Sequence, residues 1–289
     1  MGKKSRRRSE SVAKKPKRVE IPYVERPFEG LPGETDWVSM REIIPAATAT
    51  ARLTDEHGGE DVLVVTMLPE MWPAMRRSDG RLLVALQTAG GSGDASRDVA
   101  AALLLAKDAE PGDPIANLGH LEPGPRLQDV LDLDVPFEVT VEQDFAFWLA
   151  DDEERTPDIE QAIQQSSEGI VPTAPIEGVT SAYWCRMTRE FLRWARPESQ
   201  ETVLDAIARL HAERESGLEE GTKFVGAFRT CGILIPVWEL ARGTEAEELS
   251  EVCQEFEKKL EAALANEEPL TPEERRARAG IVSRQVALR

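Results

Sequence analysis

The stretch LLVALQTAGGSGDASRDVAAALLLAKD, residues 82–108, runs from an apolar segment through a glycine-rich turn into a helical pattern. Strand, glycine loop and helix in this order build many phosphate sites, because the helix N-terminus offers free N–H groups to an anion. A P-loop requires GxxxxGK[ST], whereas the last glycine here, Gly93, is followed by Asp94. A dinucleotide fingerprint requires a third glycine, which is also absent. We therefore predict that Asp94 or Ser96 caps a helix over 94–108 and that the loop holds no phosphate.

A second hypothesis for this loop is a small-ligand site. Its candidate residues are Ser92, Asp94, Ser96 and Arg97. A ligand site requires these side chains to point into a pocket, whereas a structural role requires them to serve the helix end. The loop GTEAEE, residues 243–248, precedes another helical segment, and its Thr244 and Glu247 have the spacing of a capping box. Two similar loops in the same position favour capping.

A thiol nucleophile is a further chemistry that the residue types allow. Cys185 and His211 could form such a pair if the imidazole lay within hydrogen-bond reach of the sulfur. Cys185 lies in an aromatic, strand-like segment, where cysteine usually behaves as a small apolar residue. His57 and His120 lie far apart and have no companions at metal-ligand spacing. We predict no catalytic residues, no metal and no cofactor, and although the sequence leaves enzymatic activity open, it favours a non-enzyme.

Hydrophobic periodicity predicts an α+β protein. Residues 26–37 are rich in Gly and Pro and are expected to be irregular, and the alternating stretch 137–149 is expected to be one strand. A strand pair is expected at 182–187 and 190–196. The other expected strands are 46–53, 61–67, 81–87, 222–229 and 232–240, and the other expected helices begin near Thr156 and cover about 198–214 and 245–266.

An internal similarity predicts two related lobes of antiparallel strands backed by helices. Residues 74–105 can be laid on 227–260 with Gly80 on Gly232, and both segments are expected to form strand, turn, strand, glycine loop and helix. Duplication and independent use of a common motif both remain open. The predicted divisions are a disordered basic tail (1–22), a first lobe (23–155), a second lobe (156–268) and a basic C-terminal helix or tail (269–289).

Charge is distributed very unevenly along the chain. Residues 1–22 hold nine Lys or Arg and two Glu, whereas residues 23–270 hold 21 basic and 49 acidic residues. An acidic body repels nucleic acid and anionic lipid, so only the chain ends are expected to attract polyanions. The basic residues of the tail are Lys3, Lys4, Arg6, Arg7, Arg8, Lys14, Lys15, Lys17 and Arg18. At the other end, Thr271 is expected to cap a helix whose arginines either form a docking tail or fold back onto the acidic body.

Composition also indicates the cellular compartment in which the protein is expected. The sequence has 289 residues and three widely spaced cysteines, which form neither a disulfide framework nor a zinc knuckle. No apolar run reaches the roughly 18 residues that a membrane span needs. The first residues, MGKKSRRRSE, are basic without the apolar core of a secretory signal. We therefore expect a cytoplasmic protein with no membrane partner, and its oligomeric state stays open.

Several segments together resemble an actinobacterial protein family of unknown function. They are RPFEGLPGETDWVSMREIIPAATAT, SGDASRD, AYWC…LRWARP, GTKFVGAFR, IPVWEL and LTPEERRARAGIVSRQVAL. Members are sometimes labelled topoisomerase or preprotein translocase, but this chain has only Tyr23 and Tyr183 as tyrosines and no ATPase motif. Some relatives carry an N-terminal SEC-C zinc knuckle, where this chain has lysine and arginine and no cysteine. The resemblance therefore carries over no zinc site and no catalytic residue, and it suggests that knuckle and basic tail are both docking devices.

These observations lead to two function hypotheses from different classes. The first is a non-enzymatic cytoplasmic adaptor whose basic tail docks on RNA, the ribosome or another polyanion, with weak sequence dependence and strong salt dependence. The alternative is an enzyme or small-ligand-binding protein with its site between the two lobes, near Ser92–Arg97. A purely structural partner subunit cannot be separated from the first hypothesis by sequence.

Overall fold

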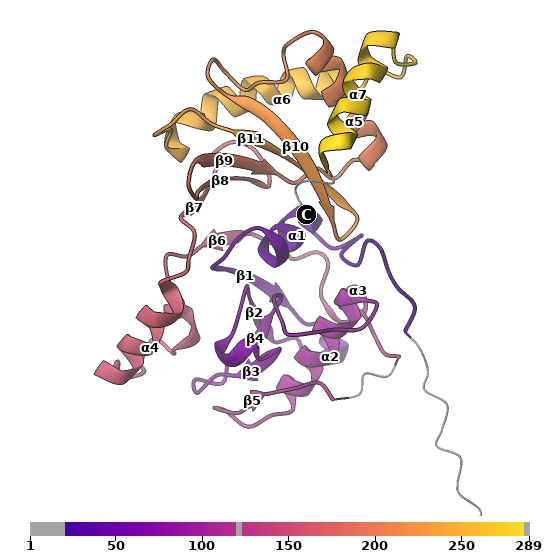
Figure 1. The fold of residues 1–289 in the computed structure, drawn as a ribbon. Helices are drawn as coiled ribbons and strands as arrows, with labels where there is room; N and C mark the ends of the chain where they lie inside the picture. Colours follow the sequence, from indigo (N-terminus) through magenta and orange to yellow (C-terminus); the bar gives the residue numbers. More distant parts are fainter. Residues whose placement is uncertain (1–20, 120–122, 286–289) are drawn as a thin grey trace, which may run out of the picture.

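Strands rich in alanine, valine and leucine form the first sheet in the computed structural model, which describes residues 21–119 and 123–285 (Figure 1). The six strands lie in the order β5–β3–β4–β2–β1–β6. Neighbouring strands are antiparallel except β2 and β4, which run parallel. The bounds are β1 Ala47–Arg52, β2 Asp61–Val65, β3 Ala74–Arg76, β4 Leu82–Ala85, β5 Pro114–Ile115 and β6 Val139–Val141.

Alternate residues of these strands point to opposite faces, as the pleat of a strand requires. Val62 and Val64 of β2 join the hydrophobic cluster under the helices, while Val65 joins a smaller cluster on the other face. That smaller cluster is covered by the segment around Phe147 and Trp148, and the Trp148 indole Nε1–H donates to the Met67 carbonyl at 2.8 Å. The first sheet is therefore packed on both faces, by helices on one and by an aromatic segment on the other.

The second sheet is wholly antiparallel, with five strands in the order β10–β11–β9–β8–β7. Trp184, Leu234 and Trp238 point from it into a cluster with helices α5 and α6. Tyr183, Ile233 and Ile235 point from the opposite face into the core of the first sheet. The bounds are β7 Thr173–Pro175, β8 Ala182–Arg186, β9 Glu190–Trp194, β10 Lys223–Thr230 and β11 Ile233–Glu239.

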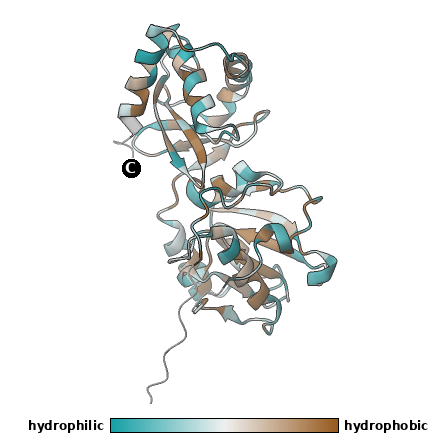
Figure 2. Cartoon of the chain, turned by 90° about the vertical axis from the view of Figure 1, so that its right-hand side faces the viewer, coloured by the Kyte–Doolittle hydropathy of each residue, from teal (hydrophilic) through white to brown (hydrophobic). Residues whose placement is uncertain are grey.

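Helix α1 lies between the two sheets, and helix α4 projects outside both of them (Figure 1). Helix α2 packs on the first sheet, α5 and α6 pack on the second, and α7 packs on α5 and β10. In Figure 2, hydrophobic residues (brown) occur along the strands, whereas hydrophobic and hydrophilic (teal) residues are mixed along the helices. The bounds are α1 Glu34–Glu42, α2 Ala95–Lys107, α3 Leu127–Val130, α4 Pro157–Ser167, α5 Gln200–Ala212, α6 Ser250–Leu264 and α7 Pro272–Gln285, and 3₁₀ turns lie at Asp55–His57, Pro69–Met71, Ala146–Trp148 and Ala246–Leu249.

The α+β class is confirmed, and most expected strands and helices are present near their expected positions. Two expectations are wrong. Residues 34–42 form helix α1, within and beyond the stretch expected to be irregular, and residues 137–149 contain only the short strand β6 followed by a 3₁₀ turn. In the second case Phe137 stacks on Trp37 at 4.0 Å, and Asp144 Oδ1 accepts a hydrogen bond from the Ala146 N–H, which turns the chain out of the sheet.

Both segments of the internal similarity form an antiparallel hairpin followed by a helix: β3–β4 with α2, and β10–β11 with α6. Gly80 and Gly232 both lie in the hairpin turns with positive φ, at 85° and 75°. The two hairpins join the rest of their sheets differently. Strand β4 runs parallel to its other neighbour β2, whereas β11 runs antiparallel to its other neighbour β9. The two units share their local order but not their place in the sheet, and the predicted lobe boundaries stay predictions.

Candidate functional site

The glycine loop between β4 and α2 is fixed at its start by helix α1. The Gln87 amide nitrogen donates to the carbonyls of Met40 (2.8 Å) and Ile44 (2.9 Å). The Arg41 guanidinium donates to the Leu86 carbonyl at 2.7 Å. These contacts place the loop beside the helix that lies between the two sheets.

Asp94 is the N-cap of α2, as predicted. Its Oδ1 accepts hydrogen bonds from the N–H groups of Ser96 (3.1 Å) and Arg97 (3.4 Å), which have no partner within the helix. Its Oδ2 forms an ion pair with Arg126 Nε at 2.7 Å. The Asp94 side chain is only 6% exposed, so this carboxylate belongs to the packed interior of the helix end.

A second carboxylate, that of Asp98, occupies the concave side of the loop. Its oxygens accept hydrogen bonds from the Ser92 N–H (2.5 Å) and the Ser92 hydroxyl (2.7 Å). A Cβ placed on Gly91 would lie 2.9 Å from Asp98 Oδ2, so a larger residue there would displace this carboxylate from its hydrogen bonds with Ser92. The Arg97 guanidinium forms an ion pair with Asp98 at 3.2 Å. The loop thus offers its N–H group to a carboxylate of the protein itself, at the position where a phosphate loop would offer it to a ligand.

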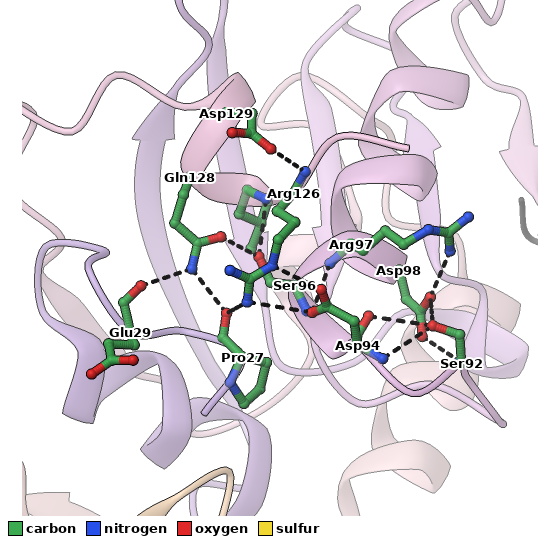
Figure 3. A network of polar contacts seen from close by, with 11 residues as sticks. Pro27, Glu29, Ser92, Asp94, Ser96, Arg97, Asp98, Arg126, Gln128 and Asp129 are labelled. Carbon is green, nitrogen blue, oxygen red and sulfur yellow. Dashed lines mark hydrogen bonds and ion pairs between the residues drawn. The ribbon is translucent and has the colours of Figure 1, made fainter. Parts of the chain in front are cut away.

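Ser96 links the helix end to a distant segment (Figure 3). Its hydroxyl donates to Gln128 Oε1 at 2.6 Å and accepts from the Leu127 N–H at 3.0 Å. The Gln128 amide nitrogen donates to the carbonyls of Pro27 and Glu29, both at 2.9 Å, and Arg126 also donates to the Pro27 carbonyl. The network therefore holds together α2, the start of α3 and the chain just after residue 26.

Little space remains beside this network. A cavity of about 20 Å³ lies next to Asp98, with Arg41 and Thr88 among its lining residues, and this is room for about one water molecule. Asp94, Ser96 and Arg97 do not line it. Among the described residues, the buried Arg97 Nε has no hydrogen-bond partner, although another nitrogen of the same guanidinium contacts Asp98. The arrangement can clamp three segments of chain, and its two carboxylates repel an incoming phosphate.

The predicted second capping box is displaced by one residue. The Glu248 carboxylate accepts from the Glu245 N–H at 2.7 Å, whereas Thr244 donates its hydroxyl to the Ala241 carbonyl at 2.9 Å. The box of Thr244 and Glu247 is therefore a wrong expectation. The Thr244 carbonyl accepts from the Trp184 indole, which turns this residue toward the second sheet and lets Glu245 begin the helical turn.

Cys185 and His211 lie in different environments. Cys185 lies on β8 and is buried, and burial raises the pKa of its thiol. His211 lies in the last turn of α5, where its Nδ1 contacts the Ser216 hydroxyl at 2.9 Å. Burial also raises the pKa of the Cys231 thiol to about 11 and that of Cys253 to about 12. The environment of each cysteine thus disfavours the reactive thiolate.

A polar cluster between α1 and β8 has no counterpart in the sequence-based predictions. Asp36 Oδ1 accepts from the Ser181 hydroxyl (2.6 Å) and the Tyr183 hydroxyl (3.0 Å), and Thr35 contacts Ser181 at 2.7 Å. Burial raises the pKa of the Asp36 carboxyl, and the hydroxyl donors partly oppose that rise. Ser181 has φ 54°, a left-handed conformation that is unusual for serine. No local motif marks this cluster, because its members are about 145 residues apart.

The predicted polyanion-binding residues Lys3, Lys4, Arg6, Arg7, Arg8, Lys14, Lys15, Lys17 and Arg18 lie outside the described residues. At the other end, Glu274 accepts from the Thr271 N–H and donates its own N–H to the Thr271 hydroxyl, so the expected cap of α7 is confirmed. Arg278 of this helix forms ion pairs with Glu201 and Asp205 of α5, and Ile281 is fully buried. The arginines of this segment were expected either to form a docking tail or to fold back onto the acidic body. Arg278 folds back.

No group of three or more His, Cys, Asp or Glu side chains in 21–119 and 123–285 is arranged to hold a metal ion. Within the same ranges, none of the helices has both the length and the apolar character needed to traverse a bilayer.

The fold and the hydrogen-bond network around Asp94 and Ser96 define an α+β protein of two sheets, with helix α1 between them. The chain belongs to a family of unknown function (DUF5926), whose model matches residues 27–289. No curated protein and no solved structure matches the chain.

Proposed function

We propose that the protein is a non-enzymatic cytoplasmic adaptor that docks on RNA, the ribosome or another polyanion through the basic residues of its first 22 positions. The observation that carries this proposal is the segregation of charge: nine basic residues and two acidic ones in 1–22, against 21 basic and 49 acidic ones in 23–270. A dense cationic segment binds polyanions by releasing counterions, without reading sequence.

The contacts of the body support this division of roles. Many of its arginines already pair with carboxylates of the protein, for example Arg77 with Asp79, Arg196 with Glu198 and Arg126 with Asp94. A paired arginine presents little net positive charge to a polyanion. The first 22 residues thus carry the densest group of cations, and they are joined to the body where the Pro27 carbonyl meets Arg126 and Gln128.

The loop at Ser92–Arg97 gives less support to the alternative of a ligand site between the lobes. Asp94 and Ser96 are both committed to hydrogen bonds within the protein, and the adjoining cavity of about 20 Å³ is too small for a metabolite. The alternative therefore lacks an observation that favours it.

The test compares three tail charges with three body charges. One variant carries Arg6→Gln, Arg7→Gln and Arg8→Gln, and the control carries Lys223→Gln, Arg242→Gln and Lys258→Gln, which are exposed positions on the body. Binding to a labelled oligouridylate and co-sedimentation with ribosomes are measured at several salt concentrations. For the oligouridylate, we expect the tail variant to lower the slope of log K against log salt by about 2, because each neutralised contact contributes about 0.7 on a single strand.

The control should bind as the unmodified protein does. Equal loss in both variants would indicate a general charge effect and contradict a tail-specific site. Absence of binding to both ribosomes and RNA at low salt would contradict the proposal itself.

A further inference from the structure

Helix α4 is amphipathic but packs into none of the hydrophobic clusters of the described residues. Ile159, Ala162 and Ile163 lie three and four residues apart, so they share one face of the helix. No residue of α4 is buried, and none belongs to the three hydrophobic clusters of the protein. Figure 1 shows the helix projecting outside both sheets. An apolar helix face that covers no core is typical of a docking surface.

An open cavity of about 410 Å³ lies along this helix, and we call its lining the α4 surface. Its residues are Asp144, Arg155, Glu160, Ile163, Gln164, Ser167 and Glu168. The Ser167 hydroxyl is shielded from solvent and has no hydrogen-bond partner among the described residues. The cavity thus combines an aliphatic wall, an unused hydroxyl and three carboxylates.

The charges of these three carboxylates are not neutralised by cations of the protein itself. Within the described ranges, none of Asp144, Glu160 and Glu168 takes part in an ion pair. The surrounding segment, residues 142–168, holds nine Asp or Glu and a single Arg. Its net charge of −8 is close in magnitude and opposite in sign to the +7 of residues 1–22.

We propose that the α4 surface docks the basic residues 1–20 of the same molecule. Lysine and arginine fit it well, because their aliphatic stems can cover Ile163 while their charged ends reach the carboxylates. Twenty extended residues span up to about 66 Å, and the expected radius of gyration of a chain of this length is about 19 Å, so the tail can reach α4 from residue 21. Tethering gives an effective concentration in the millimolar range, at which weak exposed ion pairs suffice.

The consequence is a competition for the tail. A polyanion would have to displace residues 1–20 from the α4 surface before binding them, so docking would raise the concentration of polyanion needed. The docking itself does not depend on the proposed function, since it requires only the tail and the acidic helix.

Carbodiimide cross-linking of the full-length protein tests this proposal, because the reagent joins a lysine to a carboxylate only when the two are in contact. Protein with natural nitrogen is mixed with nitrogen-15-labelled protein, so that links within one molecule can be told from links between two. We expect Lys3, Lys4, Lys14, Lys15 and Lys17 to link mainly to residues 142–168 of the same molecule. Links spread over all exposed carboxylates, or links mainly between molecules, would overturn the proposal.

A matched pair of variants makes the test site-specific. Asp144→Asn, Glu160→Gln and Glu168→Gln together should lower the yield of tail links to residues 142–168 roughly tenfold. The control removes three exposed carboxylates from α6, with Glu251→Gln, Glu255→Gln and Glu261→Gln, and should leave that yield unchanged. Circular dichroism checks that both variants are folded. Equal yields in the two variants would contradict docking at α4.

Salt gives an independent measurement on the unmodified protein. Raising ionic strength from about 0.1 M to about 1 M shortens the Debye length from about 10 Å to about 3 Å. The tail links should fall steeply over this range, and an unchanged yield would contradict electrostatic docking. Failure of this proposal would leave the RNA and ribosome measurements unaffected, because those are made on polyanion binding and not on cross-links.

Discussion

Helices α2 and α6 each follow an antiparallel hairpin and a short glycine-containing loop, yet different contacts hold their first turns. At α2, Asp94 binds Arg126, and Ser96 binds Gln128 and Leu127, residues that lie outside the hairpin and helix. Before α6, the 3₁₀ turn Ala246–Leu249 leads into the helix and has its own local cap, in which the Glu248 carboxylate accepts from the Glu245 N–H.

The difference shows that the same succession of hairpin, loop and helix can have two structural roles. At α6 the loop ends a hairpin and begins a helix, and its carbonyl at Thr244 contacts Trp184 of the same sheet. At α2 the loop also binds the chain at Pro27 and Glu29, just after the basic tail, through Arg126 and Gln128. The first cap is therefore both a helix end and the attachment of the N-terminal segment to the body.

The largest expected effect separates the two caps by stability. Asp94→Ala should lower the free energy of unfolding by about 3 kcal/mol, because it removes the cap and leaves Arg126 without its carboxylate. Glu248→Ala should lower it by only about 1 kcal/mol, because its carboxylate is exposed and makes one local bond. Urea denaturation measures both.

The restoring change is Asp94→Asn, whose side-chain oxygen can still accept from the helix N–H groups. It should recover the part of the loss that comes from capping but not the part that comes from the ion pair. Equal effects of Asp94→Ala and Glu248→Ala would show that the long-range contacts at α2 contribute nothing, and the comparison would fail.

Smaller, pH-dependent effects on stability are expected at the turn between β3 and β4. The Arg77 guanidinium, 2.6 Å from Asp79, holds the pKa of that carboxyl at about 2. Because this value lies below the ordinary one of about 3.9, the folded state binds fewer protons than the unfolded state. The stability contributed by Asp79 is therefore complete above about pH 4 and is lost as the pH falls toward 2. Acid unfolding of Asp79→Asn should lack this loss.

Asp36 provides the control of opposite sign. Its pKa is raised by burial, so the folded state binds more protons than the unfolded state, and its contribution to stability decreases as the pH rises from about 3.9 through the folded pKa. The unmodified protein should therefore lose stability as the pH rises above about 3.9, and Asp36→Asn should not show this loss. A change of the same sign in both variants would contradict the assigned environments.

Much of this arrangement could be predicted from local sequence. The hairpins, the helices after them and the Asp94 cap follow from alternation, periodicity and the preference of Asp for the N-cap. Helix α1 could not be recognised in this way. Residues 37–40 are buried in succession between two sheets, so the buried positions of this helix follow one another along the chain and form no amphipathic stripe at the spacing of three and four.

The contacts of the site were harder to predict than its cap. Arg126 reaches Asp94 across 32 positions and Pro27 across 99, and sequence spacing carries no information about such pairs. The same holds for Asp36, which meets Ser181 and Tyr183 only because α1 lies against the second sheet. The sequence also could not distinguish a glycine that provides a positive φ from a glycine that allows another group to approach closely. Gly243 has φ 87° and open space around it, whereas Gly91 is crowded by Asp98.

The smallest expected effect is the response of the α2 loop to nucleotides. ATP, GTP and NAD should leave the melting temperature unchanged, because Asp94 and Asp98 place two carboxylates where a phosphate would bind and Asp98 already accepts the Ser92 N–H. Asp94→Asn removes one negative charge and preserves an acceptor, so it is the variant most able to reveal a hidden anion site. If a nucleotide raised the melting temperature in a concentration-dependent way, and more so in Asp94→Asn, the loop would be a ligand site and its likeness to the α6 loop would be superficial. An unchanged melting temperature in both proteins would leave the two loops as helix caps that differ only in what they hold together.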